Sequence, residues 1–397
     1  MSKKKKAKEK SKSHGQLLQE LADDFTDSHK GGEAILGNSP LLDSIVKIRI
    51  PTGCPNLDAM MQGGFPCGRV TQVYGNFSTG KSTIVQSGLI WCTCNDGVAV
   101  LIDPEVSFDP ERFARMGGDP EKVILLQKSY TKPERTSKKQ GDRILPAMSV
   151  QDVFLYIRDI LNSLAGKPEW VGRPVFVGLD SLDNVTTNQA LEGEKQGMTL
   201  KPRLIREGFR DISTPIAKAR AAFVIVSQII EQIGGYHHKT QETSGGGGPK
   251  FISSVRLNTR RMGRYPTDES TGNLLIRTTA TKSKLFRPYT QAVTAINNDS
   301  GWALEGIDPD YCLLYGCEES ITTRGGWKYV IPTGELAQKH ELVEGEEVAF
   351  QMATWREVIR RNPKIRAYLM DIIAAKYAKP SVFVEPEPDD VEIPDEG

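Results

Sequence analysis

No run of apolar residues in this sequence approaches the roughly 18 that a membrane-spanning helix needs. The richest run, residues 221–226, has only the length of a strand. The lysine-rich N-terminus has no apolar segment behind it, which does not fit a secretory signal. With 38% hydrophobic and 25% charged residues, the composition also excludes a wholly disordered chain. We therefore expect a soluble, cytoplasmic protein without a membrane partner.

Cysteine is scarce and lacks the spacing of a metal site. The chain has six cysteines, with no Cys-x-x-Cys pair and far below the density of a secreted disulfide scaffold. We expect most of them to be small buried or surface thiols; they are Cys54, Cys67, Cys92, Cys94, Cys312 and Cys317.

A large net charge is also missing, but the charge is unevenly placed. The formal net charge is +1, yet residues 1–13 carry seven lysines, and residues 381–397 carry seven acids and no base. We interpret residues 1–15 as a basic disordered arm and residues 381–397 as an acidic disordered tail. The basic arm would suit contact with nucleic acid, and the acidic tail would suit competition with nucleic acid for a basic surface of the protein. Improved solubility explains either end equally well.

Strands and helices alternate through the middle of the chain. Apolar, β-branched runs lie between helix-length stretches, which indicates parallel pairing and an α/β sheet covered by helices on both faces. Ligands bind such sheets at the carboxyl ends of the strands. The expected parallel strands are residues 70–74, 98–103, 123–127, 175–180 and 223–228.

The flanking segments complete the expected organisation, in which 397 residues suggest two or three domains of about 150 residues each. Residues 16–50 contain a helix at 16–25 and a strand at 45–50. The core would span residues 51–300, with later strands at 254–258, 274–281 and 292–296. A small C-terminal domain at 301–380 would contain an amphipathic helix in residues 354–377.

Two connections are longer than the usual loop of about two to six residues. They are residues 189–203 and residues 231–249, both rich in glycine and polar side chains. The second contains four consecutive glycines, Gly245 to Gly248, which hold a fixed conformation only at high entropic cost. We expect a loop that becomes ordered on a ligand.

A phosphate-binding loop is the strongest chemical signal. G-x-x-x-x-G-K-S follows an expected strand and opens a helix, which is the context that this motif requires. Backbone N–H groups close on the β-phosphate where glycine leaves room, the lysine meets the β and γ oxygens, and the serine ligates Mg²⁺. The expected ATP-binding residues here are Gly75, Asn76, Phe77, Ser78, Thr79, Gly80, Lys81, Ser82 and Thr83.

Two carboxylates follow neighbouring expected strands. Asp180 ends the strand at 175–180 and suits a water-mediated Mg²⁺ ligand, although an aspartate there can also cap a helix. Glu105, just beyond the strand at 98–103, is placed to polarise the water that attacks the γ-phosphate. Taken alone, Glu105 fits an ordinary surface carboxylate better than a catalytic one.

Short motifs surround the phosphate loop in a fixed order over about residues 16–296. They are Ile50-Pro51-Thr52-Gly53, Leu57-Asp58, Gly63 to Val70, Asp103-Pro104-Glu105, Asp109-Pro110, Asp180-Ser181, Glu192-Gly193-Glu194, Ser227-Gln228-Ile229, Lys250-Phe251, Ser254 to Leu257, Arg260 to Gly263 and Lys282-Ser283-Lys284. This order closely resembles that of the bacterial RecA recombinases. The resemblance implies a RecA-type P-loop NTPase core, with residues 16–50 contacting the next protomer.

The resemblance also implies roles for particular residues. Glu105 would activate water, Asp180 would be the second Mg²⁺ ligand, and Gln228 would sense the γ-phosphate. Lys282 and Lys284 resemble a pair that reaches the neighbouring protomer's γ-phosphate in a filament, although two lysines spaced like this otherwise indicate a solvated face. The implied catalytic set also includes Lys81.

The two long connections would then be DNA-binding loops. Glycine N–H groups approach phosphates closely, lysine and arginine supply charge, and an apolar side chain can wedge between bases. An ordinary mobile surface loop is the alternative. The implied DNA-binding residues are Met198, Leu200, Lys201 and Arg203 in the first loop and Ile233, Gly234, Ser244, Gly245, Gly246 and Gly247 in the second.

The sequence departs from the family at the nucleotide base. The resemblance also implies that Asp109 and Arg112 bind ATP. The family's adenine-stacking tyrosine, three residues after Asp109, is Arg112 here, and its guanidinium plane suits stacking on a base. Residues 129–146, rich in lysine and proline, resemble an insertion. Such divergence fits a bacteriophage version of the family.

The resemblance implies a DNA-dependent ATPase that uses ATP and Mg²⁺ and forms a helical filament of its own copies on single-stranded DNA. It would pair that strand with a homologous duplex and exchange strands in recombination and repair, with single-strand-binding or mediator proteins as further partners. Its place would be the nucleoid or the cytoplasm of a phage-infected bacterium. The alternatives are a RecA-fold hexameric helicase or motor, and a recombination mediator that does not hydrolyse ATP.

Overall fold

The computed structural model describes most of the chain, in two units. The described residues are 13–28, 34, 36, 48–127, 148–165, 167–170, 172–191, 200–232, 240–243, 247–265, 273–298 and 305–378. The unit Met1–Ile48 contains helix α1 (His14–Ser28), which confirms the helix expected at residues 16–25. The unit Arg49–Gly397 contains everything that follows. Among the described residues, no helix combines the length and apolarity needed to cross a bilayer.

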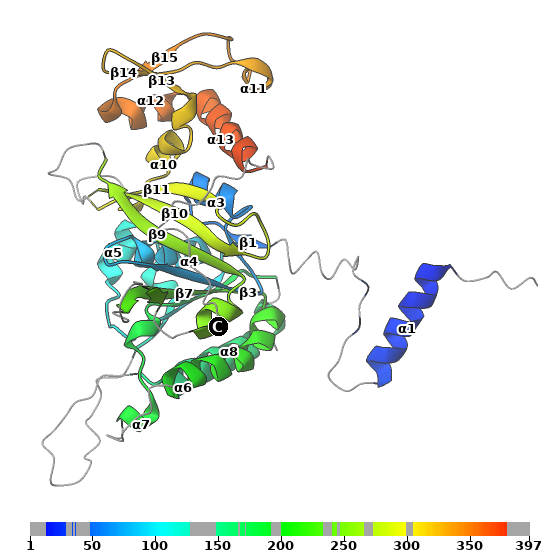
Figure 1. The fold of residues 1–397 in the computed structure, drawn as a ribbon. Coiled ribbons are helices and arrows are strands. Elements are labelled where there is room, and N and C mark those ends of the chain that lie inside the picture. The colour runs from blue at the N-terminus through cyan, green and yellow to red at the C-terminus, as the bar shows by residue number, and fades with distance from the viewer. Residues whose placement is uncertain are drawn as a thin grey trace, which may run out of the picture. The chain divides into compact units, whose positions relative to one another are not determined.

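A large mixed sheet forms the centre of the second unit (Figure 1). Its order is β12-β11-β10-β9-β3-β7-β6-β4-β5, with β8 paired to β7. The six strands from β9 to β5 in this order are parallel, and the expected α/β core is thereby confirmed. The strands are β3 (Arg69–Gly75), β4 (Val98–Ile102), β5 (Val123–Leu126), β6 (Val175–Leu179), β7 (Ala221–Gln232), β8 (Thr240–Thr243), β9 (Val255–Gly263), β10 (Leu274–Ser283), β11 (Gln291–Asn297) and β12 (Gly306–Ile307).

Helices cover both faces of this sheet because alternate strand residues point to opposite sides. In β6, for example, Phe176 joins one buried cluster, whereas Val175 and Val177 join the other. Helices α6 (Val150–Ala165) and α8 (Leu200–Lys218) complete the second cluster, and Figure 1 shows them side by side. The first cluster holds α4 (Lys81–Cys94), α3 (Pro55–Met60) and α10 (Pro309–Gly316). Each fully buried aliphatic or aromatic side chain stabilises this arrangement by about 1.5–3 kcal/mol.

The C-terminal region adds an antiparallel three-stranded sheet and three helices. The strands are β13 (Ile321–Arg324), β14 (Trp327–Val330) and β15 (Val348–Phe350), and the helices are α11 (Gly334–Lys339), α12 (Trp355–Arg361) and α13 (Pro363–Ala378). Residues 354–377, where a helix was expected, are helical but divided in two, because Pro363 disfavours a helical conformation at Asn362 and starts a new helix.

Shorter elements connect these parts. They are β1 (Arg49–Ile50), β2 (Phe65–Pro66), α5 (Pro110–Arg115), α7 (Asn188–Leu191), α9 (Gly247–Ile252) and the 3-10 turns η1 (Pro120–Lys122), η2 (Pro168–Trp170), η3 (Leu182–Asn184), η4 (Glu318–Ser320) and η5 (Met352–Thr354).

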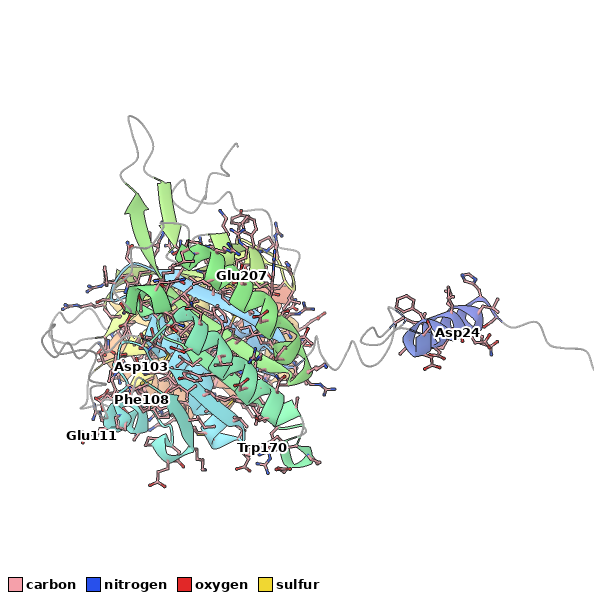
Figure 2. All side chains as sticks on the ribbon, turned by 90° about the horizontal axis from the view of Figure 1, so that it is seen from below. Asp24, Asp103, Phe108, Glu111, Trp170 and Glu207 are labelled. Carbon is pink, nitrogen blue, oxygen red and sulfur yellow. The ribbon has the colours of Figure 1, made fainter. Side chains whose placement is uncertain are left out.

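Both expected DNA loops are partly regular structure. Leu200, Lys201 and Arg203 belong to the first turn of α8, where a proline is tolerated because the first N–H groups of a helix have no partner inside it. In the second connection, β7 continues to Gln232 and forms a hairpin with β8. Figure 2 shows this hairpin standing out beyond the layered core.

Two glycines of the run of four belong to a helix. Gly247 and Gly248 open α9, and a Cβ at Gly248 would lie 3.2 Å from a methyl carbon of Ile205 in α8. Glycine here lets α9 approach α8 closely. Gly245 and Gly246 lie outside the described residues, as do Met198, Ile233, Gly234, Ser244 and the insertion expected at residues 129–146.

Candidate nucleotide and DNA site

The phosphate loop joins β3 to α4 in the expected strand–loop–helix context. A Cβ at Gly75 would lie 2.3 Å from the backbone oxygen of Thr259 in β9, so only glycine fits where the loop leaves the sheet. Gly80, the residue before α4, has φ +73°, a left-handed conformation that glycine adopts at little cost. The first N–H groups of α4 therefore face an open loop, which is an anion site ready for phosphate.

Lys81 is buried at the start of α4 and points into this loop. Its ammonium donates a 2.6 Å hydrogen bond to the backbone oxygen of Asn76, which also accepts from Thr79 at 2.9 Å. Burial lowers the pKa of Lys81, while the carboxylates of Asp180, Asp183 and Glu105 oppose that shift. The ammonium is hydrogen-bonded to a neutral carbonyl oxygen, so it can exchange that bond for one to a phosphate oxygen.

Ser82 and Asp180 meet beside the lysine. The Ser82 hydroxyl hydrogen-bonds to the Asp180 carboxylate, whose pKa is raised to about 6, mainly by burial. No group of three or more potential metal ligands among His, Cys, Asp and Glu occurs in the part of the chain that the structure describes. One hydroxyl and one carboxylate next to a phosphate loop are nevertheless what Mg²⁺ uses, since the nucleotide and water supply its remaining ligands. The pair fits a magnesium ion that arrives with the nucleotide.

Glu105 lies on the turn after β4, and its carboxylate is held from the neighbouring strand end. Glu105 Oε1 accepts a hydrogen bond from Ser181 Oγ at 2.7 Å and another from the Asn184 amide. The turn itself is fixed by buried Asp103, which accepts from the backbone N–H of Phe108 at 2.8 Å; Figure 2 shows these two residues close together. The structure thus brings Glu105 to the same edge of the sheet as the phosphate loop.

Gln228 lies next to the phosphate loop in β7, directly opposite Gly75 in the parallel pairing. Its backbone N–H donates to Asp183 Oδ2 at 2.9 Å. Burial raises the pKa of Asp183, and this hydrogen bond and nearby Lys201 oppose the shift. Asp183 and Asn184 were not expected from the sequence; both belong to the short turn η3, directly after Asp180-Ser181.

Arg112 lines a cavity of about 360 Å³ at the phosphate loop. Its guanidinium donates to Gln86 Oε1 at 3.1 Å and to Thr83 Oγ1 at 3.3 Å, and its Nε lies 3.9 Å from the buried carboxylate of Glu305. Asp109 caps α5 instead of facing the cavity, since its Oδ1 accepts the backbone N–H of Arg112 at 3.1 Å. The cavity is lined by Ser78, Thr79, Gly80, Lys81, Ser82, Thr83, Arg112, Leu274, Ile296 and Asn298.

Lys282 and Lys284 lie toward the other end of the sheet from the phosphate loop. Lys282 pairs with Arg256, which is opposite Gln72 in β3, three residues before the loop begins at Gly75. Three residues of strand span about 10 Å. The Lys282 ammonium points farther away, donating to the backbone oxygens of Lys250 at 2.7 Å and Phe251 at 3.1 Å.

The described DNA-loop residues differ in exposure. Lys201 is half-buried, and its ammonium donates to the backbone oxygen of Asp183 at 3.0 Å. Arg203 is exposed and forms an ion pair with Glu207 at 2.8 Å, one turn along α8. An exposed pair of this kind contributes little to stability, so Arg203 exchanges partners easily.

Comparison with known protein families gives one match over most of the core. Residues 24–136 and 172–303 match the RecA N-terminal domain. The chain belongs to the RecA family. The interruption between the two matched segments is residues 137–171, which overlaps the insertion expected at residues 129–146.

Curated RecA proteins extend the similarity over most of the chain. Protein RecA of Salinispora tropica is 27% identical over 350 residues, covering 87% of each chain, and Protein RecA of Thermus aquaticus is 28% identical over 343 residues, covering 85% of this chain and 86% of that one. The chloroplast DNA repair protein recA homolog 1 of Arabidopsis thaliana is 30% identical over 322 residues; the match covers 79% of this chain and 63% of that protein. This chain is therefore a divergent RecA-family protein.

Proposed function

We propose that this protein is an ATP-dependent recombinase, which assembles as a filament on single-stranded DNA and exchanges strands with a homologous duplex. The observation that carries the proposal is the placement of Lys81, Asp180, Glu105 and Gln228 at one edge of the sheet, with Lys282 near the other. Membership of the RecA family supports recombination and repair as the purpose of the ATPase.

The residues at this edge account for ATP hydrolysis. The loop N–H groups and Lys81 hold the phosphates, and Ser82 and Asp180 hold Mg²⁺, which neutralises charge on the phosphate oxygens when it is bound. Glu105 takes a proton from the attacking water as its oxygen bonds to the γ-phosphorus, and the bond to the β-phosphate oxygen breaks to release ADP. Gln228 contacts the γ-phosphate and passes its presence or loss to the β7–β8 hairpin.

The lysine pair supports assembly. Lys282 and Lys284 lie toward the end of the sheet opposite their own phosphate loop, so they reach a γ-phosphate only when another protomer stacks against that end. Hydrolysis therefore requires adjacent copies. Other proposed partners are single-stranded and homologous duplex DNA, with single-strand-binding or mediator proteins during loading. The proposed place is the nucleoid or the cytoplasm of an infected bacterium, which rests on the proposed bacteriophage origin.

The test is strand exchange between a circular single strand and a homologous linear duplex, with ATP and Mg²⁺, imaged in parallel by electron microscopy. We expect joint molecules and helical filaments from the parent protein, none from Lys81→Ala, and filaments with strongly lowered but measurable ATP turnover from Glu105→Gln. Rings that unwind a fork would instead establish a motor. Binding to DNA without strand exchange or ATP hydrolysis would establish a mediator.

A further inference from the structure

The turn η3 touches three parts of the machinery that are distant in sequence. Asn184 donates to the Glu105 carboxylate, the Asp183 carboxylate accepts the N–H of Gln228 at 2.9 Å, and the Asp183 carbonyl accepts the Lys201 ammonium at 3.0 Å. Glu105 follows β4, Gln228 lies in β7, and Lys201 lies in the first turn of α8. A turn of three residues thus joins the water-activating carboxylate to the two segments that lead into the DNA loops.

The bond to Gln228 replaces a missing strand partner. β6 pairs with β7 only as far as Leu179 opposite Ile225, and β7 continues beyond that point. A backbone N–H that loses its ladder partner needs another acceptor, and the Asp183 carboxylate supplies one. The position of β7 where it leaves its neighbour is therefore fixed by a side chain of η3, four residues before the strand ends at Gln232.

The bond to Lys201 fixes the start of α8 in the same way. The lysine is half-buried, and burial lowers its pKa while Asp183 opposes that shift. A half-buried ammonium needs nearby acceptors, so movement of the helix start away from η3 is costly. The Arg203 side chain, two residues later, is instead exposed to solvent. Of these two basic residues in α8, Lys201 is thus the one held inward against the catalytic edge.

Building on the function proposed above, we propose that Asp183 and Asn184 are positioning residues that couple both DNA loops to the Glu105 carboxylate. DNA that orders the β7–β8 hairpin and the start of α8 pulls on the two partners of Asp183. The turn then moves as a unit, and Asn184 carries that movement to the carboxylate that orients water. A displacement of about 1 Å at such a group changes turnover by about a hundredfold.

The first experiment measures coupling. ATP turnover of full-length protein is measured with and without an oligo(dT) strand for the parent, Asp183→Ala, Asp183→Asn and the control Asp159→Ala, an exposed residue that pairs with Arg158 at 3.2 Å. We expect Asp183→Ala to lower the ratio of DNA-stimulated to DNA-free turnover by about fivefold or more. Asp183→Asn keeps an oxygen that accepts the Gln228 N–H and retains most of the ratio, and the control retains all of it.

A direct structural readout accompanies the kinetics. Hydrogen exchange at the Gln228 amide should be faster in Asp183→Ala than in Asp183→Asn or the parent. Circular dichroism identifies a variant that does not fold, and in that case Asp183→Asn and Asn184→Ala carry the test. An unchanged stimulation ratio in folded Asp183→Ala, or equal losses in Asp183→Ala and Asp159→Ala, would overturn the coupling.

The second experiment tests Asn184. Asn184 is exposed, so its replacement leaves the core intact. Asn184→Ala should lower kcat with little change in KM for ATP, and it should have no further effect in a Glu105→Gln background, because the two residues act through one contact. Additive losses would overturn the role. ATP hydrolysis by the parent protein with oligo(dT) is measured before any variant is compared. If the parent hydrolyses no ATP, the proposed function itself is overturned.

Discussion

Arg112 lies against the first turns of α4, where its guanidinium donates to Gln86 Oε1 at 3.1 Å. The same side chain borders the cavity at the phosphate loop and lies 3.9 Å from Glu305, whose shorter contact, at 2.7 Å, is with Arg115. Two arginines thus share one buried carboxylate, so the cluster keeps a net positive charge. We propose that this planar cation stacks on the nucleotide base.

The first prediction concerns this stacking surface. Arg112→Ala should weaken binding of a fluorescent ATP analogue between about twofold and thirtyfold, the range expected for a cation–π contact. Arg115→Ala is the matched control, because Arg115 shares Glu305 but does not line the cavity. Equal affinity in the parent and Arg112→Ala would show that the base lies elsewhere.

The second prediction concerns action between protomers. Lys282→Ala and Lys284→Ala should each lower ATP turnover on single-stranded DNA by about a hundredfold, as for loss of one donor to transition-state charge. Mixing Lys282→Ala with Lys81→Ala should restore part of the turnover, because some junctions then join an intact phosphate loop to an intact lysine. Lys122→Ala, at an exposed position, serves as the control. No recovery in the mixture would argue against action between protomers.

The third prediction concerns the pH dependence of stability through Asp58. Burial raises the pKa of this carboxyl from 3.8 to about 7, against opposing hydrogen bonds from Thr52 and Gly53. The folded state therefore keeps a proton that the unfolded chain has lost between pH 4 and pH 7, and stability falls as the pH rises through that window. The loss is at most about 4 kcal/mol.

Urea unfolding at several pH values checks this prediction. The side chain at position 58 of Asp58→Asn cannot titrate, so this variant lacks the stability loss of the parent. The difference in free energy of unfolding, variant minus parent, should therefore increase as the pH rises from about 4 to about 7. Asp96→Asn, in an exposed turn with φ +50°, is the control because asparagine tolerates that conformation. A difference between Asp58→Asn and the parent that does not change with pH would contradict the assignment.

The fourth prediction concerns the acidic tail. Removal of residues 381–397, which carry seven acids, should tighten binding to duplex DNA several-fold at low salt, since phosphate contacts dominate such affinity. A full-length variant with those acids changed to their amides should behave like the deletion if charge is the cause. Unchanged duplex binding across magnesium concentrations would exclude the tail as an inhibitor.

The core strands were predictable because buried parallel strands are continuous apolar runs, as in β4 and β6. The phosphate loop was predictable for a different reason, since its glycines and lysine stand at fixed spacing whatever surrounds them. The start of α8 was missed because Pro202 suggests a loop, although the first turn of a helix accommodates proline.

The turn η3 was beyond the reach of sequence patterns. Asp183 and Asn184 follow Asp180-Ser181 but match no spacing that indicates a role. Their partners come from β4, β7 and α8, and only the order of strands in the sheet brings those elements together. The inward position of Lys201 is of the same kind, because charge alone suggests a residue that faces DNA.

Strand β7 runs for twelve residues, from the buried centre of the sheet to the tip-side hairpin, and contains neither glycine nor proline. At about 3.3 Å per residue, β7 is about 40 Å long. It lacks the glycine and proline residues at which strands usually bend. A stiff strand transmits a shift of one end to the other, whatever side chains it carries. Under the function proposed above, we expect substitutions at the hairpin end of β7 to change DNA binding, while a shift of the strand still reaches Gln228 beside the phosphate loop.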